Sequence, residues 1–493
     1  MCPADAVRIV LKGGTIVDGT GAPPRAGTVV VGDGRVEAVL GATLAPRAGE
    51  VVDVTGRVVA PGFIDVHNHA HDEMEGGILR IPYADNMLRQ GVTTIVAGNC
   101  GGSPWPIGEH LEKAKTLRLA TNYALLVGHG TLRRRVRESG LDLHTRDGLV
   151  HMGRELVQAL DEGALGMSSG QANASQQDLP TEEVVALAKV LGKRNRVYTV
   201  HMRGEADDVF DNVREAITVA EKSGARVEIS HLKVIGGKNW GRGGELLALL
   251  NEAAGRHVPV GADAYPYAAC YGGIWAMVIP HWERQGEKVT EATHAAIRDR
   301  LTALGGPERI RVARASERVP YVGHTLAELA ATTQLEPADL VIDMALHGSA
   351  SCIGFLMDER DVADIVSHPE TAVISDGQVR LLGRGISHPR NYGTFPRVLA
   401  KYVREEKRLA LDAAVRKMTS LPAQRFGFTD RGVIREGAIA DLVVFDPATI
   451  QDTATFEKPF QYPVGIDHIL IGGRWAMRAG KVAPEGLGHV ITL

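Results

Sequence analysis

Six side chains of types that commonly bind metal ions are spread widely over the chain, and each follows a short apolar run. His67 and His69 come after the run Gly62–Val66. Because side chains alternate along a strand, the two imidazoles point to one side and can share a metal ion. An isolated pair of this kind is a weak signal, but the placement recurs. The other four residues are Cys100 after Thr93–Asn99, His201 after Tyr198–Val200, His231 after Val227–Ser230 and Asp376 after Ala372–Ser375.

Taken together, these residue types indicate zinc. Zinc is bound in proteins by imidazole nitrogen, thiolate sulfur and carboxylate oxygen. Each residue alone is better explained by packing, since a single buried cysteine such as Cys100 behaves as a small apolar side chain. The recurrence of such residues at the ends of several predicted strands favours a shared site instead, because clustered titratable groups mark functional positions. We therefore expect the six residues to converge on zinc.

The middle of the chain has the pattern of strands alternating with helices. Apolar runs such as Val92–Val96 and Val197–Val200 are separated by segments such as Asp208–Lys222, which has apolar residues at helical spacing. This alternation predicts a TIM-type (β/α) barrel, whose catalytic face is formed by the carboxyl ends of the strands. A doubly wound sheet is the alternative, but no G-x-G-x-x-G segment opens a helix in this sequence.

The two ends of the chain are rich in β-strand signals instead. Asp33-Gly34 lies between the runs Thr28–Val31 and Val36–Val39 and predicts a two-residue hairpin. Similar runs return at 441–445 and 469–471. We expect both ends to form one discontinuous small β domain. The predicted domains are residues 1–60 as its first part, 61–425 as the metal-dependent catalytic barrel and 426–493 as its second part.

The composition of the chain limits its partners. The chain has 493 residues, of which 44% are hydrophobic and 23% charged, and its formal net charge is −4. Without a basic block, nucleic acid is not an expected partner. Neither a membrane-spanning run nor a secretory leader is apparent, so we expect a cytoplasmic protein that acts on a small molecule. The four cysteines are far apart and do not predict a disulfide framework.

Several longer motifs resemble known enzymes. Pro61–His69 and Ile439–Asp446 look like the two ends of an amidohydrolase-superfamily enzyme. The internal motifs resemble the D-aminoacylase (N-acyl-D-amino-acid deacylase) family, and the resemblance covers about residues 8 to 480. These motifs are Gly98–Gly101, His231–Lys233, Asn239–Gly241, Asp263–Tyr267, Ser375–Gly377 and His388–Arg397.

The resemblance implies a (β/α)8 barrel with a β-sandwich made of both termini, and a site of one or two zinc ions. Cys100 takes the place that bridges the two metal positions. It also implies that Lys233, Tyr265 and Arg390 hold the substrate carboxylate. The residues that match the first metal position are His67, His69, Cys100 and Asp376, and those that match the second are Cys100, His201 and His231.

The implied activity is zinc-dependent cleavage of N-acyl-D-amino acids to a carboxylic acid and a free D-amino acid. Zinc lowers the pKa of a bound water to about 7, and Asp376 beside it can take the proton and give it to the leaving amine. No covalent nucleophile is needed, and Ser168–Gly170 lacks the G-x-S-x-G pattern. The polar loop 171–177 leads us to expect small or polar D side chains.

Two alternatives remain open from the sequence. One is a dipeptidase or cyclic-amide hydrolase of the same superfamily, although such cyclic-amide enzymes ordinarily use a carboxylated lysine where Cys100 stands. The other is a non-catalytic relative that serves as a scaffold, although such relatives tend to lose metal ligands. Outside the motifs, we predict that Arg133–Arg135 is a solvated helix face, and His129 is either structural or close to the site.

Overall fold

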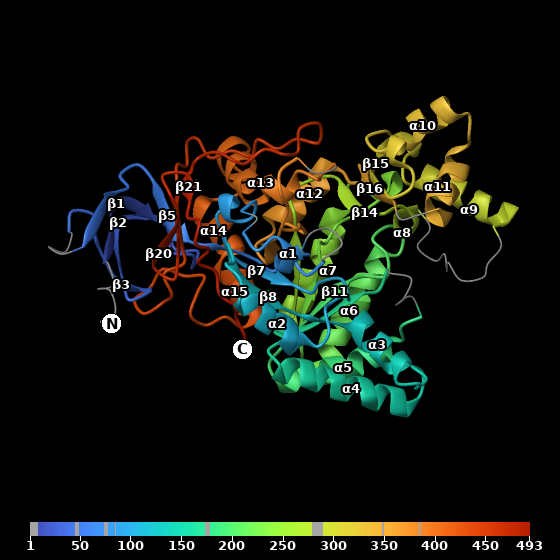
Figure 1. Ribbon diagram of the computed structural model, residues 1–493, viewed down its shortest axis with the longest axis horizontal. Coiled ribbons are helices and arrows are strands. Elements are labelled where there is room, and N and C mark those ends of the chain that lie inside the picture. The colour runs from blue at the N-terminus through green and yellow to red at the C-terminus, as the bar shows by residue number, and fades with distance from the viewer. Residues whose placement is uncertain are drawn as a thin grey trace.

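The computed structural model describes residues 8–44, 49–72, 77–83, 85–172, 178–278, 289–347, 350–383 and 386–493. Strands from both ends of the chain form one connected sheet in the order β21-β20-β19-β18-β5-β1-β2-β3, with β4 also paired to β1. Figure 1 shows these blue and red segments side by side at the left. The strands are β1 (Ile9–Ile16), β2 (Arg25–Gly32), β3 (Arg35–Gly41), β4 (Glu50–Asp53), β5 (Val58–Pro61), β18 (Leu442–Phe445), β19 (Ile466–Ile471), β20 (Arg474–Arg478) and β21 (Lys481–Val482).

Two features hold this terminal sheet together. Residues Asp33 and Gly34, with φ angles of 50° and 77°, make the predicted tight turn between β2 and β3, and positive φ at both positions is typical of such hairpins. Strand β18 pairs antiparallel with β5, so that Val444 lies opposite Val59. The sheet encloses its own apolar core, and the two ends of the chain therefore fold as one body beside the barrel.

The middle of the chain forms the barrel that the sequence predicts. Two parallel sheets, β6-β7-β8 and β9-β10-β11-β12-β13-β17, continue into each other because β9 begins two residues after β8 ends. The ring closes where Asn68 bridges Gly377 in parallel and the Asp376 N–H donates to the His67 carbonyl. The strands are β6 (Phe63–Asp65), β7 (Val92–Ala97), β8 (Asn122–Leu125), β9 (Val127–Gly128), β10 (Gly166–Gly170), β11 (Val197–His201), β12 (Arg226–Ile229), β13 (Val260–Ala264) and β17 (Thr371–Val373).

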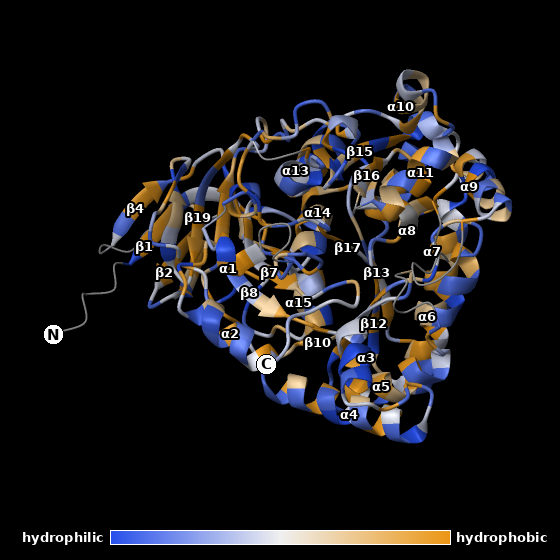
Figure 2. Ribbon diagram, turned by 45° about the vertical axis from the view of Figure 1, so that its right-hand side comes forward, coloured by the Kyte–Doolittle hydropathy of each residue, from blue (hydrophilic) through white to orange (hydrophobic). Residues whose placement is uncertain are grey.

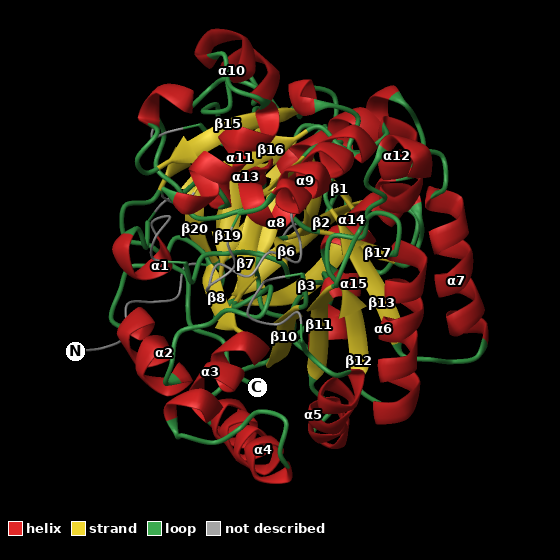
Figure 3. Cartoon of the chain, turned by 90° about the vertical axis from the view of Figure 1, so that its right-hand side faces the viewer, coloured by secondary structure: helices red, strands yellow, loops and turns green. Residues whose placement is uncertain are grey.

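Helices cover the outside of the barrel, and Figure 3 shows α5, α6 and α7 flanking β11 to β13. Helix α6 buries Val209, Val213 and Ile217 at the predicted helical spacing and ends at Gly224 in a left-handed conformation. In Figure 2 such helices carry hydrophilic residues outward and hydrophobic residues toward the strands. The helices are α2 (Ile107–Lys115), α3 (His129–Glu138), α4 (Arg146–Asp161), α5 (Thr181–Lys193), α6 (Val209–Ser223), α7 (Gly243–Gly255), α12 (Glu359–Ser367), α13 (Arg390–Arg397), α14 (Leu411–Met418) and α15 (Ser420–Phe426).

An insertion between β13 and β17 departs from the simple alternation of strands and helices. Its three strands pair antiparallel in the order β14-β16-β15, and it lies at the upper right of Figure 1. Loops at the catalytic face of a barrel can grow in this way without disturbing the ring. The elements are β14 (Cys270–Gly273), α8 (Ile274–Val278), α9 (Glu291–Ala303), β15 (Ile310–Ala315), α10 (Leu326–Thr333), α11 (Pro337–Leu346) and β16 (Ala350–Gly354).

The division into residues 1–60, 61–425 and 426–493 stays a prediction. In the part of the chain that the structure describes, no helix combines the length and the apolar character needed to cross a membrane.

Candidate metal centre

The six residues predicted to bind metal all lie at carboxyl ends of barrel strands. Three of them, Cys100, His231 and Asp376, have positive backbone φ angles of 54°, 36° and 49°. This conformation is unfavourable for residues with a side chain, and it is found where the surrounding structure enforces it, often at functional sites. By position, His67 and His69 follow β6, Cys100 follows β7, His201 ends β11, His231 follows β12 and Asp376 follows β17.

The turn that carries Cys100 is fixed by its neighbours. Gly98 has a φ of 82°, and a Cβ atom there would lie 2.2 Å from the carbonyl oxygen of Leu126, so that only glycine fits. The Ser168 hydroxyl, from β10, donates to the Gly98 carbonyl and accepts from the Gly101 N–H at 3.1 Å. These contacts hold Cys100 in the middle of the strand ends.

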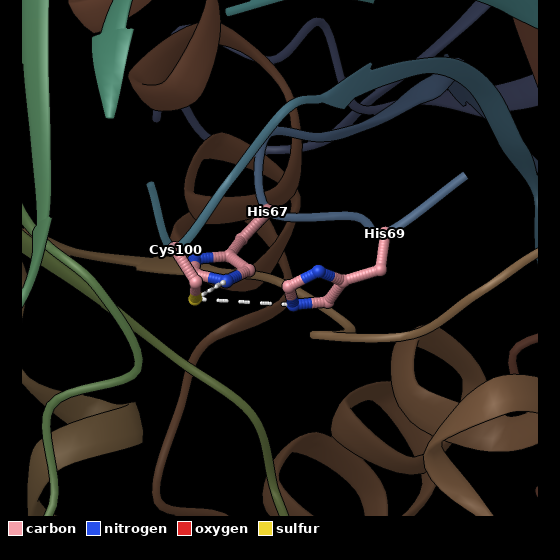
Figure 4. Close-up of side chains that lie close together, drawn as sticks. All are labelled: His67, His69 and Cys100. Atoms are coloured by element: carbon pink, nitrogen blue, oxygen red, sulfur yellow. Dashed lines mark hydrogen bonds between the residues drawn. The ribbon is translucent and has the colours of Figure 1, made fainter. Parts of the chain in front are cut away.

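The Cys100 sulfur lies within 4 Å of a nitrogen from each of four histidines. Figure 4 shows its contacts with His67 and His69, which follow the same strand. The distances from Sγ are 3.5 Å to Nε2 of His67, 3.9 Å to Nε2 of His69, 3.5 Å to Nδ1 of His201 and 3.8 Å to Nε2 of His231. The sulfur can therefore contribute to two adjoining sets of ligands.

Asp376 completes the group. Its Oδ1 lies 3.0 Å from Nε2 of His69 and 3.5 Å from Nε2 of His67, while its Oδ2 accepts a hydrogen bond of 2.8 Å from Arg390. Three overlapping sets have ligand atoms that all lie within 4.8 Å of one another. They are His67, His69 and Cys100; Cys100, His201 and His231; and His67, His231 and Asp376.

The charge states of these groups suit a cation. Burial lowers the pKa of His67 well below its ordinary value and that of His201 to about 3, so both imidazoles are neutral. Burial and the Asp376 charge raise the pKa of the Cys100 thiol, and a coordinated metal ion reverses this by deprotonating the thiol. Neutral imidazole nitrogens, a cysteine sulfur and a carboxylate oxygen that converge within 4.8 Å are the donor atoms that zinc takes. The residues present therefore fit one or two zinc ions.

The three residues predicted to hold a carboxylate also lie together beside this group. Lys233 is buried, with Nζ 2.6 Å from Oε1 of Glu205. The Arg390 guanidinium lies 5.0 Å from the ring centre of Tyr265, and Lys233 Nζ lies 5.7 Å from the same ring. Among the described residues, the buried Tyr265 hydroxyl has no hydrogen-bond partner. This cluster offers two cations and a hydroxyl to an anion.

Glu205 and Asp263 belong to the site, although the sequence did not single them out for a role. Oε1 of Glu205 lies 2.9 Å from Nδ1 of His231, on the opposite side of the ring from Cys100. Burial alone raises the pKa of Glu205, but Lys233 and the neighbouring histidines outweigh it and lower that pKa. Asp263 accepts from the backbone N–H of His231 at 2.5 Å. Carboxylates that orient ligand histidines are common around metal ions. In the sequence, the position of Glu205 four residues after His201 was the feature that could have indicated its role.

A second buried polar group, the His129 cluster, lies on α3, α5 and β10. His129 contacts the Ser169 hydroxyl through Nδ1 and Glu183 through Nε2, both at 2.9 Å. Arg133 is fully buried and donates to Glu183 at 2.8 Å and to Asp178 at 2.7 Å. The prediction of a solvated face at Arg133–Arg135 is therefore wrong for Arg133, because the helical turn directs this one arginine inward.

Two cavities open onto the candidate metal centre. The larger, about 390 Å³, is lined by His69, Cys100, Asp376 and Arg390 among others. The smaller, about 170 Å³, shares His201, His231 and Asp376 with it and extends toward α8 and α9. We call the smaller one the Met277 cavity, after a residue in its wall. A ligand at the metal centre can thus place one of its groups in each cavity.

Comparison with known proteins gives consistent matches. The sequence pattern of the Amidohydrolase family matches residues 50–235 and 361–476. The chain is 34% identical to an N-acyl-D-aspartate deacylase of Alcaligenes xylosoxydans xylosoxydans (99% of this chain, 96% of the relative) and 34% identical to a D-aminoacylase of the same organism (98% and 97%). The solved N-acyl-D-glutamate deacylase of Bordetella bronchiseptica, complexed with zinc and a phosphonate inhibitor, is 32% identical, with a TM-score of 0.86 over 99% of this chain and 100% of that one.

Proposed function

The chain belongs to the Amidohydrolase family, and we propose that it is a zinc-dependent deacylase that hydrolyses N-acyl-D-amino acids to a carboxylic acid and a free D-amino acid. The observation that carries the proposal is the contact of the Cys100 sulfur with four histidine nitrogens, immediately beside the Lys233, Tyr265 and Arg390 cluster. The first feature supports amide hydrolysis, and the second supports a substrate that carries a carboxylate.

The first two of the overlapping sets, together with the contacts of Asp376 with His67 and His69, support an assignment of the metal ligands. One zinc ion would be held by His67, His69, Cys100 and Asp376, and a second by Cys100, His201 and His231. When bound, zinc polarises the scissile carbonyl and lowers the pKa of a water molecule at the site. Glu205 orients His231 through its Nδ1 atom.

Asp376 moves the proton in this proposal. Burial would raise its pKa, but the Arg390 charge and the neighbouring histidines hold that pKa well below the ordinary value. The carboxylate is therefore ionised at neutral pH and ready to accept a proton from the attacking water at Oδ1 or Oδ2. It then gives this proton to the nitrogen of the leaving amino acid.

The substrate carboxylate binds to the Lys233, Tyr265 and Arg390 cluster. An arginine fork matches a carboxylate well, and Arg390 uses only one of its N–H groups on Asp376. Fixing the carboxylate and the scissile carbonyl at two points leaves the side chain at the α-carbon one open direction. This two-point attachment supports strong discrimination between D and L forms.

The test is an assay of the zinc-loaded protein on matched N-acetyl and N-formyl derivatives of D- and L-amino acids, together with dipeptides and a cyclic amide. We expect cleavage of the N-acyl-D-amino acids with little turnover of the L forms. Preferential cleavage of dipeptides or of the cyclic amide would contradict the proposal, as would a zinc-loaded protein that cleaves no amide at all.

A further inference from the structure

The Met277 cavity adjoins both the candidate metal ligands and two residues of the carboxylate-binding cluster. Its walls come from the loops that follow β11, β12 and β13 and from helices α8 and α9. It shares His201, His231 and Asp376 with the cavity above the metal centre. It is also bounded by Lys233 and Tyr265. An amino acid held by its α-carboxylate at Lys233 and Tyr265 would therefore have this cavity within reach of its side chain.

Arg300 differs from the other charged side chains in the wall of this cavity in its lack of an ion-pair partner within the described part of the chain. Arg300, on α9, has no carboxylate within 4.0 Å and no hydrogen bond from its side chain among the described residues, and its Nε atom is buried without a partner. Every other charged side chain of the wall is paired. The pairs are Arg203 with Glu215 at 2.9 Å, Lys233 with Glu205 at 2.6 Å and Asp376 with Arg390 at 2.8 Å.

The surroundings of Arg300 only partly solvate and partly neutralise its charge. Burial lowers its pKa, and the more distant charges of Asp207 and Asp208 only partly oppose that effect. Arg300 is half-buried, and a guanidinium that is partly removed from water is stabilised by a hydrogen-bonded anion. Its planar donor groups suit a carboxylate in particular. The cavity thus has a place for one more negative charge, which the described protein groups do not supply.

The rest of the wall is apolar. Ile235, Met277 and Leu356 line the cavity together with Ala276. Such walls suit the methylene carbons of a ligand, while a few polar groups fix its end. A volume of about 170 Å³ limits the ligand group to a short one. A short aliphatic stem that ends in a carboxylate meets all of these conditions.

We propose that Arg300 binds the side-chain carboxylate of the substrate, so that the enzyme selects N-acyl derivatives of acidic D-amino acids. This inference rests on the proposed deacylase function and gives its substrate class. The two carboxylates of the substrate then have separate partners, because the α-carboxylate is held by the Lys233, Tyr265 and Arg390 cluster. An uncharged amide in the same place would leave the charge of Arg300 without a counterion.

The test compares zinc-loaded wild type and Arg300→Met on N-acetyl-D-glutamate, N-acetyl-D-aspartate, N-acetyl-D-glutamine and N-acetyl-D-methionine. We expect kcat/KM of the wild type for the better acidic substrate to exceed that for the glutamine derivative by at least about 10-fold, as charge-assisted hydrogen bonds provide. Arg300→Met should abolish this preference while changing the neutral substrates by less than about 3-fold. Arg300→Lys should keep part of it, since a cation remains.

Arg298→Met is the matched control, because Arg298 lies on the same helix but is exposed and paired with Glu291 and Glu336. It should leave the preference unchanged. A wild type that does not prefer acidic substrates would overturn the inference, and so would an Arg300→Met protein that keeps the preference.

A binding experiment separates this inference from the proposed function. The affinities of zinc-loaded wild type and Arg300→Met for D-glutamate, D-aspartate and D-glutamine are measured by calorimetry, without any need for turnover. If no N-acyl substrate is cleaved, the deacylase proposal fails. Tighter binding of an acidic amino acid than of glutamine in the wild type alone would still support the role of Arg300, and equal binding would contradict it.

Discussion

The candidate metal centre and the His129 cluster are both buried groups of histidine and carboxylate, yet their internal contacts differ. In the His129 cluster each contact joins a donor to an acceptor, and the Arg133 guanidinium neutralises Glu183. In the metal centre, histidine nitrogens face the Cys100 sulfur, and Nδ1 of His201 lies 3.1 Å from Nε2 of His231. The first group is held by hydrogen bonds and an ion pair, whereas the side chains of the second converge in the manner of zinc ligands.

This difference shows why a list of nearby side chains does not define an active site. Ser169, His129 and Glu183 have the order of contacts of a serine-hydrolase triad. However, Ser169 and His129 are fully buried, so that no substrate reaches the hydroxyl. The metal centre opens onto two cavities instead. Ligand atoms that converge beside a cavity indicate metal chemistry, whereas hydrogen bonds and an ion pair between buried side chains indicate a structural role.

The largest effect is expected from removing the sulfur of Cys100, which lies at the centre of the candidate metal centre. Cys100→Ala should lower zinc content and reduce activity by more than about 100-fold, since even residues that only orient metal ligands cost 10- to 100-fold. The fold should persist, because the barrel core does not depend on one thiol. Zinc analysis, turnover and circular dichroism check this. Cys352→Ala is the control, since Cys352 is buried in β16 and its loss should leave zinc content unchanged. Full zinc and normal turnover in Cys100→Ala would remove the distinction between the clusters.

A change in the His129 cluster should affect stability instead of chemistry. Glu183→Gln leaves Arg133 buried with less compensating charge, and we expect a loss of about 3 kcal/mol in the free energy of unfolding, as for other broken buried ion pairs. Zinc content and kcat should stay near wild type at temperatures where the protein is folded. Denaturant unfolding and zinc analysis measure the two effects. A variant that unfolds normally but has lost its zinc would reverse the assignment of the two clusters.

Asp376→Asn should lower kcat by about 100-fold or more, the usual effect of losing general acid–base catalysis. Its amide oxygen can still coordinate weakly, so part of the zinc should remain. Steady-state kinetics at full zinc loading separates the loss of proton transfer from the loss of metal. A kcat close to wild type would show that another group takes the proton.

The smallest effect is expected at the serine of the sealed cluster. Ser169→Ala removes one hydrogen bond with His129 and should cost about 1 kcal/mol of stability, while kcat remains unchanged. Thermal unfolding and turnover on the preferred substrate measure this. Loss of activity with intact zinc would instead indicate a covalent serine mechanism.

The sequence predicted the parts of the molecule that follow from strand geometry. His201 and Asp376 are far apart in the chain, but parallel strands bring their carboxyl ends to one face, so placement after a strand was enough to group them. The contacts of Glu205 and the position of Arg300 in a cavity wall depend on how loops and an inserted helix pack, which no local periodicity records. Arg133 was predicted to be exposed because a run of three arginines resembles a surface.

One expectation about the substrate concerns residues that the structure mostly leaves out. The polar loop 171–177, from which small or polar side chains were expected, lies largely outside the described residues, which include only 171 and 172 of it. Gln171 itself is buried. The selectivity proposed here therefore rests on Arg300 and the walls of the Met277 cavity, which came from the tertiary structure.

The central claim, that Cys100 provides sulfur to a zinc ion held by histidines, is tested most directly by X-ray absorption spectroscopy at the zinc edge of the zinc-loaded protein. The account predicts a sulfur shell at about 2.3 Å in addition to nitrogen or oxygen neighbours at about 2.0–2.1 Å. In Cys100→Ala the sulfur shell should be absent. A wild-type spectrum with nitrogen and oxygen neighbours alone would contradict the account.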